Sequence, residues 1–160
     1  MPVEEFAYHR SLTPTLAMLL GLAIAETLVV HLVAIAIWGW TAAVLVGIAD
    51  LSLVVGLIAL LRTIRNYPVT IADGLLTMRV GRLRTIVIPL EQVSGLRESW
   101  DHAALKRKDV SNLALAAWPN VFIDLAAPVR SGRREVMAVA HRLDDPATFM
   151  AAIRHRLPAV

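Results

Sequence analysis

Hydrophobic residues along the chain are concentrated in two long runs near its N-terminus, from Pro14 to Trp38 and from Ala42 to Leu61. Each run is long enough to cross a hydrocarbon core of ~30 Å as a helix rising about 1.5 Å per residue. The connector Gly39-Trp40-Thr41 is short and uncharged. The pattern therefore predicts a transmembrane α-helical hairpin over residues 14–61, preceded by a short segment, 1–13, and followed by a second domain, 62–160.

After Asn66 the hydrophobic pattern changes from a helical period to the alternation of short strands. Asp73-Gly74 between two such runs is a strong signal for a tight β-hairpin turn. A helix is expected to begin at Pro146, because an aspartate before it can cap the first turn. Strands are expected over 67–72, 75–80, 83–89, 90–96, 112–117, 121–127 and 134–143, turns at 81–82 and 131–132, an irregular polar segment over 97–110, and on the terminal helix an apolar face of Phe149, Ala152, Ile153 and Leu157.

That order of elements predicts an α+β domain, mostly β, in which a bent sheet or two packed sheets are closed by a terminal helix. The hairpin, the segment Tyr-Pro-Val-Thr-Ile-Ala-Asp-Gly-Leu-Leu-Thr-Met-Arg-Val-Gly from Tyr67, and the segment Ile-Pro-Leu-Glu-Gln-Val-Ser-Gly-Leu from Ile88 resemble the bacterial pleckstrin-homology-like (PH-like) membrane proteins. The resemblance implies a PH-like bent sheet or barrel with a C-terminal helix. It implies neither a catalytic activity nor phosphoinositide binding.

Charge separates the two halves of the 160-residue chain, which is 57% apolar and has a net charge of +3. Residues 1–61 carry one basic and four acidic side chains, whereas residues 62–160 carry 15 basic and nine acidic ones. Arg62 and Arg65 follow the second apolar run directly, while the connector between the runs has no charge. By the positive-inside rule, the chain is expected to be a multi-pass protein of the bacterial inner (plasma) membrane with both termini cytoplasmic.

Three polar residues, Glu26, His31 and Asp50, lie inside the apolar runs. His31 and Asp50 are almost equally far from Trp40 at the turn, so a contact between them across the hairpin is expected. Ionisable residues at such positions are candidates for proton relays or partner contacts, and the alternative is that they only lock the hairpin. Small residues recur every fourth position in Ala17-Gly21-Ala25 and Ala43-Gly47, a spacing that suits packing within the hairpin and leaves a homo-oligomer open.

The other candidate residues are basic. A basic domain beside a membrane most simply faces anionic headgroups, at about 1 kcal/mol per basic residue near the surface, and solvated turns are the alternative. Nucleic acid is disfavoured, because only Trp100 and Trp118 could serve as stacking platforms among the basic residues. The candidate lipid-contact residues are Arg62, Arg65, Arg79, Arg82, Arg84, Lys106, Arg107 and Lys108, and Arg130, Arg133 and Arg134 form a further basic group.

No assembled catalytic set is recognisable in the sequence. The chain has no cysteine, no phosphate-binding glycine loop and no G-x-G-x-x-G. The cluster His141-x-x-Asp144-Asp145 is better explained by helix capping than by a metal. We therefore expect no enzyme, cofactor or metal, but a PH-like module anchored in the inner membrane for protein interaction or assembly at its surface, with an unidentified membrane or cytoplasmic protein as partner and anionic lipid as a secondary contact. The alternative is a subunit of a membrane complex that uses Glu26, His31 and Asp50 for proton handling or partner contacts.

Overall fold

The computed structural model describes residues 3–10, 12–115 and 117–156, and it divides into two compact units. The helical unit is Thr13–Thr63, and the β unit combines the residues before Thr13 with those from Ile64 onward. The N-terminal segment thus belongs to the same unit as the C-terminal part of the chain. The sequence pattern did not predict this association.

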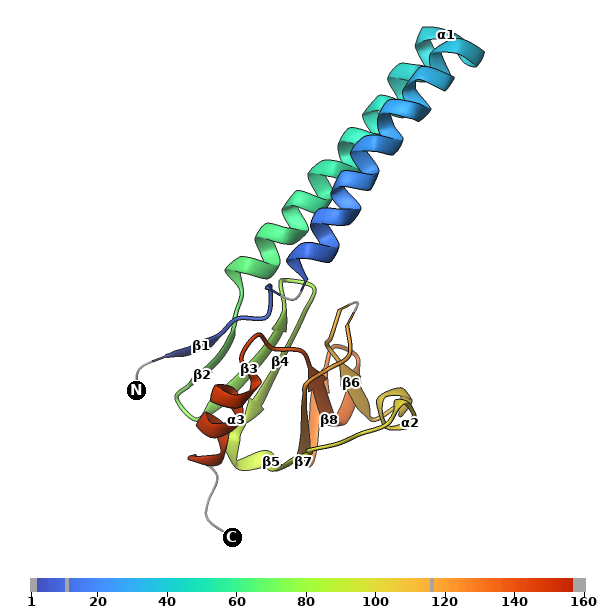
Figure 1. Cartoon of the computed structure of the whole chain (residues 1–160). Helices are drawn as coiled ribbons and strands as arrows, with labels where there is room; N and C mark the ends of the chain where they lie inside the picture. The colour runs from blue at the N-terminus through green and yellow to red at the C-terminus, as the bar shows by residue number, and fades with distance from the viewer. Residues whose placement is uncertain (1–2, 11, 116, 157–160) are drawn as a thin grey trace. The chain divides into compact units, whose positions relative to one another are not determined.

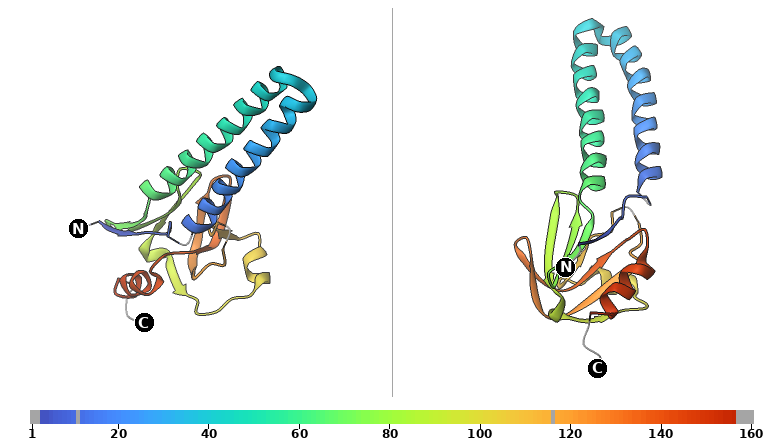
Figure 2. Two further views of the ribbon diagram at one scale, coloured as in Figure 1. Left: turned by 45° about the horizontal axis from the view of Figure 1, so that its top comes forward. Right: turned by 90° about the vertical axis from the view of Figure 1, so that its left-hand side faces the viewer.

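The helical unit is formed by α1 (Thr13–Asn66), which carries a proline in its first turn as expected. α1 is interrupted at Gly39, whose φ of 79° and ψ of −174° are not helical. Glycine adopts a positive φ without steric cost, because it lacks a Cβ atom. The chain reverses direction at this residue, and the two arms of α1 run side by side (Figures 1 and 2).

α1 exposes apolar side chains around its whole circumference, including Leu22, Leu32, Leu45 and Leu53. Its most apolar window has a mean hydropathy of 2.6. In the part of the chain that the structure describes, α1 is the one helix long and apolar enough to cross a membrane. An apolar surface of this extent is not typical of a helix in water.

Over its described residues the β unit contains two four-stranded sheets (Figure 1). The first sheet is antiparallel in the order β1-β2-β3-β4, and the second has the order β5-β7-β8-β6, in which only the β6–β8 pair is parallel. A 3₁₀ turn, η1, leads from the first sheet into the second. The bounds are β1 (Glu4–Phe6), β2 (Val69–Ala72), β3 (Leu75–Val80), β4 (Arg84–Pro89), η1 (Leu90–Gln92), β5 (Val93–Leu96), β6 (Val110–Asn112), β7 (Val121–Ser131) and β8 (Arg134–His141).

The predicted turn and helix start are confirmed. Asp73 and Gly74 both have positive φ, as a two-residue hairpin turn requires, and the flanking residues of β2 and β3 are paired. The terminal helix α3 (Pro146–Arg154) is capped by Asp145, whose carboxylate accepts a hydrogen bond from the backbone N–H of Thr148 at 3.0 Å. α3 buries Phe149 and Ile153, as its pattern predicted, whereas Leu157 lies outside the described residues.

The segment between β5 and β7 differs from the prediction. It contains a short helix, α2 (His102–Lys106), capped by Asp101, in a stretch that the polar pattern marked as irregular. The strand expected over 112–117 is instead β6 at Val110–Asn112. A three-residue strand at the edge of a sheet has too few positions for an alternating pattern, so the sequence signal was misplaced.

His141 is a neutral histidine in the core of the β unit. Its Nδ1 accepts a hydrogen bond from the backbone N–H of Arg142 at 2.9 Å, so the proton is on Nε2 and is donated to the carbonyl of Arg79 at 3.0 Å. Burial lowers the pKa of His141 to about 4 from its ordinary 6.5. The ring also contacts that of Tyr8, with 5.0 Å between centroids.

We expect the β unit to lose stability as the pH falls from 6.5 to about 4. Because the pKa of His141 is lower in the folded state than in the unfolded state, the unfolded chain binds the extra proton over this range. The loss should approach roughly 3 kcal/mol below pH 4. Thermal unfolding of the detergent-solubilised chain, followed across this range, measures it. The pH dependence should be smaller in His141→Gln, and an unchanged slope in that variant would exclude His141 as the cause.

Candidate anion-binding groove

The loop between β3 and β4 lies at the end of the β unit where the chain enters and leaves α1. Thr70 of β2 pairs with Thr77 of β3. When this register is extended toward α1, Tyr67, the residue after α1, stands level with Val80. The guanidinium carbon of Arg79 lies 6.0 Å from the centre of the Tyr67 ring. The same loop is tied to the N-terminal segment, since the hydroxyl of Tyr8 accepts a hydrogen bond from the Gly81 N–H at 2.6 Å.

A groove with a volume of about 560 Å³ lies between the start of β4, the start of β6 and the β7–β8 turn. Three separate segments of the chain therefore contribute to its lining. Figure 2 shows the β3–β4 loop and the β7–β8 hairpin approaching each other on one side of the β unit. The cations that line this basic groove are Arg84, Lys108, Arg133 and Arg134.

Two serine hydroxyls line the same groove. Ser111 is 4% exposed and Ser131 is 8% exposed, and their Oγ atoms lie 3.4 Å apart. Arg84 reaches toward this pair, because its Nη1 donates to the Oγ of Ser111 at 3.4 Å. A long and strongly charged side chain is therefore directed across the opening toward two buried polar groups.

The positive charge of the basic groove is not neutralised by carboxylates in the part of the chain that the structure describes. No aspartate or glutamate is among its lining residues, and none of its four cations forms an ion pair with a carboxylate in the described ranges. Other arginines are paired with carboxylates instead, among them Arg97 and Arg107. Asp124 hydrogen-bonds Arg97 at 2.7 Å and Asp109 hydrogen-bonds Arg107 at 2.6 Å, and each bond raises the pKa of its guanidinium.

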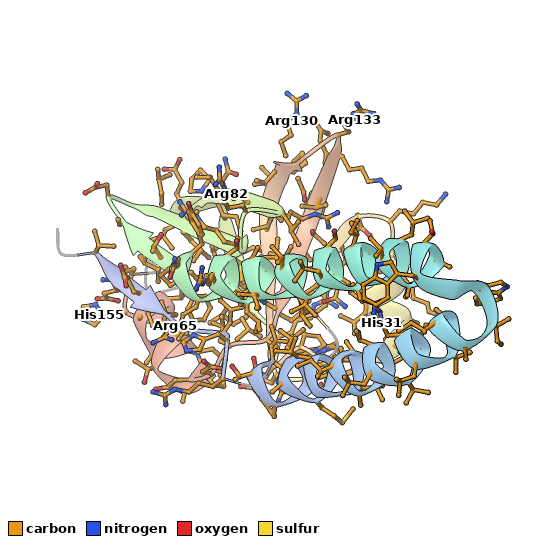
Figure 3. All side chains as sticks on the ribbon, turned by 90° about the horizontal axis from the view of Figure 1, so that it is seen from above. His31, Arg65, Arg82, Arg130, Arg133 and His155 are labelled. Atoms are coloured by element: carbon orange, nitrogen blue, oxygen red, sulfur yellow. The ribbon has the colours of Figure 1, made fainter. Side chains whose placement is uncertain are left out.

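The structure separates the predicted basic residues into different groups. Arg84 and Lys108 line the groove, whereas Arg82 and Lys106 do not, and Arg107 is paired with Asp109. Figure 3 shows Arg130 and Arg133 pointing outward at the β7–β8 hairpin. The remaining candidates are Arg79, which lies at Tyr67, and Arg62 and Arg65, which are exposed near the end of α1.

Sequence reasoning missed four lining residues as site residues. Arg133 and Arg134 were noticed as a basic group but were not assigned to a site. Ser111 and Ser131 gave no signal at all, because nothing local distinguishes a serine that lines a groove from one in a solvated turn. The only usable signal was the occurrence of three basic groups beside three turns.

Within the helical unit, His31 lies between the two arms of α1 (Figure 3). A Cβ atom added at Gly47 would lie 3.2 Å from the Cε1 atom of His31, so the ring packs closely against this glycine. Nδ1 of His31 and Oδ2 of Asp50 are buried without hydrogen-bond partners in the described residues, so these two atoms do not join the side chains. Glu26 is exposed on the first arm.

The residues of the His141-x-x-Asp144-Asp145 cluster, for which a metal was disfavoured, have other roles. His141 uses both ring nitrogens in hydrogen bonds to the backbone, and Asp145 caps α3. Asp144 accepts a hydrogen bond from the backbone N–H of Arg10 at 3.0 Å. In the described ranges no three histidine or acidic side chains gather as metal ligands.

Searches of family models, of curated proteins and of solved structures with this chain found no match. The interpretation of the groove therefore rests on its own geometry and charge.

We expect Gly47→Leu to separate the two arms of α1. The larger side chain would overlap the imidazole of His31, and overpacking of this kind costs about 1–3 kcal/mol. Gly56→Leu is the matched control, because no atom lies within 4 Å of the position where its Cβ atom would stand. Unfolding in mixed detergent, followed by circular dichroism, should show a loss for the first variant only. Equal behaviour of the two would mean that the arms do not meet at Gly47.

Proposed function

We propose that this protein is a non-enzymatic module anchored in the bacterial inner membrane by α1, whose β unit contacts anionic lipid headgroups and a protein partner at the cytoplasmic surface. The observation that carries the proposal is the basic groove, a set of cations that have no carboxylate partners among the described residues. Such a site attracts anions from solution or from a membrane surface.

Membrane insertion of α1 is supported by its length and by its surface. Each arm is longer than the ~20 apolar residues that a bilayer core requires. The turn at Gly39 carries no charge, whereas Arg62 and Arg65 follow the second arm. By the positive-inside rule the turn is then outside, and both termini and the β unit are cytoplasmic.

Contact of the β unit with lipid is supported by the β3–β4 loop. Leu83 is 70% exposed at this loop, with Arg82 before it and Arg84 after it. An apolar side chain between two cations suits the headgroup region, where the apolar group enters the interface and the cations meet phosphates. The loop lies beside Tyr67, the residue that follows α1, because the guanidinium carbon of Arg79 is 6.0 Å from the centre of the Tyr67 ring.

A PH-like architecture of the β unit stays a prediction. It is supported by the order of two sheets followed by α3, and by the corner that η1 makes between β4 and β5. In this proposal the fold positions the loops, and residues on the loops make the contacts with lipid and partner.

The second candidate function is a subunit of a membrane complex. The observation that favours it is the pair of buried polar atoms, Nδ1 of His31 and Oδ2 of Asp50, that lack hydrogen-bond partners within the helical unit. Buried polar groups are normally satisfied, so a partner helix or a proton pathway could supply the missing contacts. The exposed stripe Ala17-Gly21-Ala25 would allow such a helix, or a second copy of α1, to approach closely.

We expect a single cysteine at Thr41 to react with a membrane-impermeant maleimide added outside spheroplasts, and one at Glu98 to react only after lysis. The chain contains no cysteine, so each variant has one reactive position. Glu98 is highly exposed in the β unit, which makes it a suitable cytoplasmic reporter. Labelling of both positions, or of Glu98→Cys alone, before lysis would refute the proposed orientation.

We expect a polarity-sensitive dye on Leu83→Cys to shift to the blue in nanodiscs that contain phosphatidylglycerol, compared with neutral nanodiscs. The shift should decrease in about 1 M salt, where the Debye length is only ~3 Å. Leu75→Cys is the matched control, because Leu75 is also exposed but lies beside the Asp73-Gly74 turn at the opposite end of β3. Absence of a blue shift at Leu83, or an equal shift at Leu75, would contradict contact through the β3–β4 loop.

A further inference from the structure

We propose that the basic groove binds a phosphomonoester, the terminal phosphate either of a lipid headgroup or of a soluble phosphorylated molecule. The inference deepens the proposed function and rests on it only for the lipid as a source. It goes beyond general attraction to anionic lipid, because it assigns one group, with defined contacts, to one site.

The first argument is the convergence of charge. Arg84, Lys108 and Arg134 line the groove from the start of β4, the segment after α2 and the start of β8, and Arg133 lines it at the β7–β8 turn, where its side chain points outward. Cations on several sides of one cavity can contact a tetrahedral anion simultaneously, which cations along a flat surface cannot do. A volume of about 560 Å³ also matches small-molecule sites, which span ~300–1,000 Å³.

The second argument is the placement of the nearby acid. Along β8, Arg134 and Val136 line the groove, so the alternation of side chains directs Glu135 to the opposite face. Glu135 instead stands opposite Arg130 in the register of β7 and β8. The carboxylate of Glu135 in the β7–β8 hairpin therefore does not face the groove and does not offset its positive charge.

The third argument is an uncommitted hydroxyl hydrogen. Ser111 and Ser131 share one hydrogen bond, in which either Oγ can be the donor, and Arg84 donates to Ser111. Each hydroxyl has one hydrogen, so the pair has two hydrogens and uses one of them. In the described ranges no acceptor is assigned to the second, which can therefore donate to an oxygen of a bound phosphate.

These donors favour a phosphomonoester over other anions. A phosphomonoester carries close to two negative charges at neutral pH and has three terminal oxygens that accept hydrogen bonds. One guanidinium group can donate two parallel hydrogen bonds to two oxygens of a phosphate, and the ammonium group of Lys108 can add a further positive charge. A phosphodiester has one charge and two free oxygens, so it would leave part of this donor set unused.

The test compares two double variants of the full chain that remove equal charge. Arg84→Gln/Lys108→Gln removes two cations that line the groove, and Arg82→Gln/Lys106→Gln removes two cations of the same types, each two residues away, that do not line it. The probes are glycerol 3-phosphate titrated into the protein in a neutral detergent, and phosphatidic acid or phosphatidylglycerol in nanodiscs. Calorimetry measures the soluble probe, and native mass spectrometry measures the retained lipid.

We expect saturable binding of a phosphomonoester, weakened at least about tenfold for each groove cation removed and no more than about threefold in the control variant. The amount of phosphatidic acid retained by the protein should exceed the amount of phosphatidylglycerol. Binding of glycerol 3-phosphate and phosphatidic acid alike would identify the phosphate as the recognised group. Binding of only one of them would identify the source as soluble or as lipid.

Equal losses in the two double variants, or no saturable binding of either phosphomonoester, would overturn the inference. Arg133→Gln/Arg134→Gln gives an independent test at the exposed hairpin turn, where substitutions should not disturb the core, and it should also weaken binding. If the groove variants bind phosphomonoesters as well as the control while the dye on Leu83→Cys still responds to anionic lipid, the phosphate site is refuted and the proposed lipid contact is retained. If the dye does not respond while glycerol 3-phosphate binds in the groove, the phosphate site is retained and the proposed lipid contact is refuted.

Discussion

The pairing of β1 with β2 is the constraint on which the arrangement of the chain depends. β1 precedes α1 and β2 follows it, and Phe6 stands opposite Val69 in their register. Both ends of α1 therefore leave the β unit close together, so the helix between them must reverse direction an odd number of times. Gly39 provides one reversal, and if α1 crosses a membrane, the number of crossings is even. If α1 crosses a membrane, the strand pairing therefore requires both ends of α1 to lie on the same side of it.

Several contacts hold this short edge strand in place. Glu4 forms a bidentate ion pair with Arg156, with contacts of 2.6 and 3.2 Å, and this bond lowers the pKa of the Glu4 carboxyl. The ring of Phe6 packs edge-on against Phe149 of α3 at 5.0 Å. The terminal helix therefore fixes the N-terminal strand, and the two ends of the sequence close the same unit. A three-residue strand would pair only weakly without such support.

Local signals predicted the elements that local chemistry determines. Asp73-Gly74 required positive φ at both residues, and Asp145-Pro146 required a capped helix start, so both could be recognised without tertiary information. β1 could not, because Glu-Glu-Phe has no alternation of its own and its partner is more than sixty residues away. The basic groove could not be predicted for the same reason. Its cations come from three segments, and only the fold distinguishes those that line it from their neighbours two residues away.

The buried polar atoms of the helical unit that lack hydrogen-bond partners affect the stability of α1. Gly47 lets the His31 ring enter between the arms, and Asp50 follows Gly47 by three residues, so Asp50 lies on the same face of the second arm as the glycine that the His31 ring packs against. Leaving a buried polar atom without a hydrogen bond costs about 1–3 kcal/mol in proteins. Two such atoms would reduce the stability of the paired arms of α1. This cost is recovered only if a group outside the described helices forms hydrogen bonds with these atoms. The face of α1 that carries them is therefore where a partner helix of a membrane complex would bind.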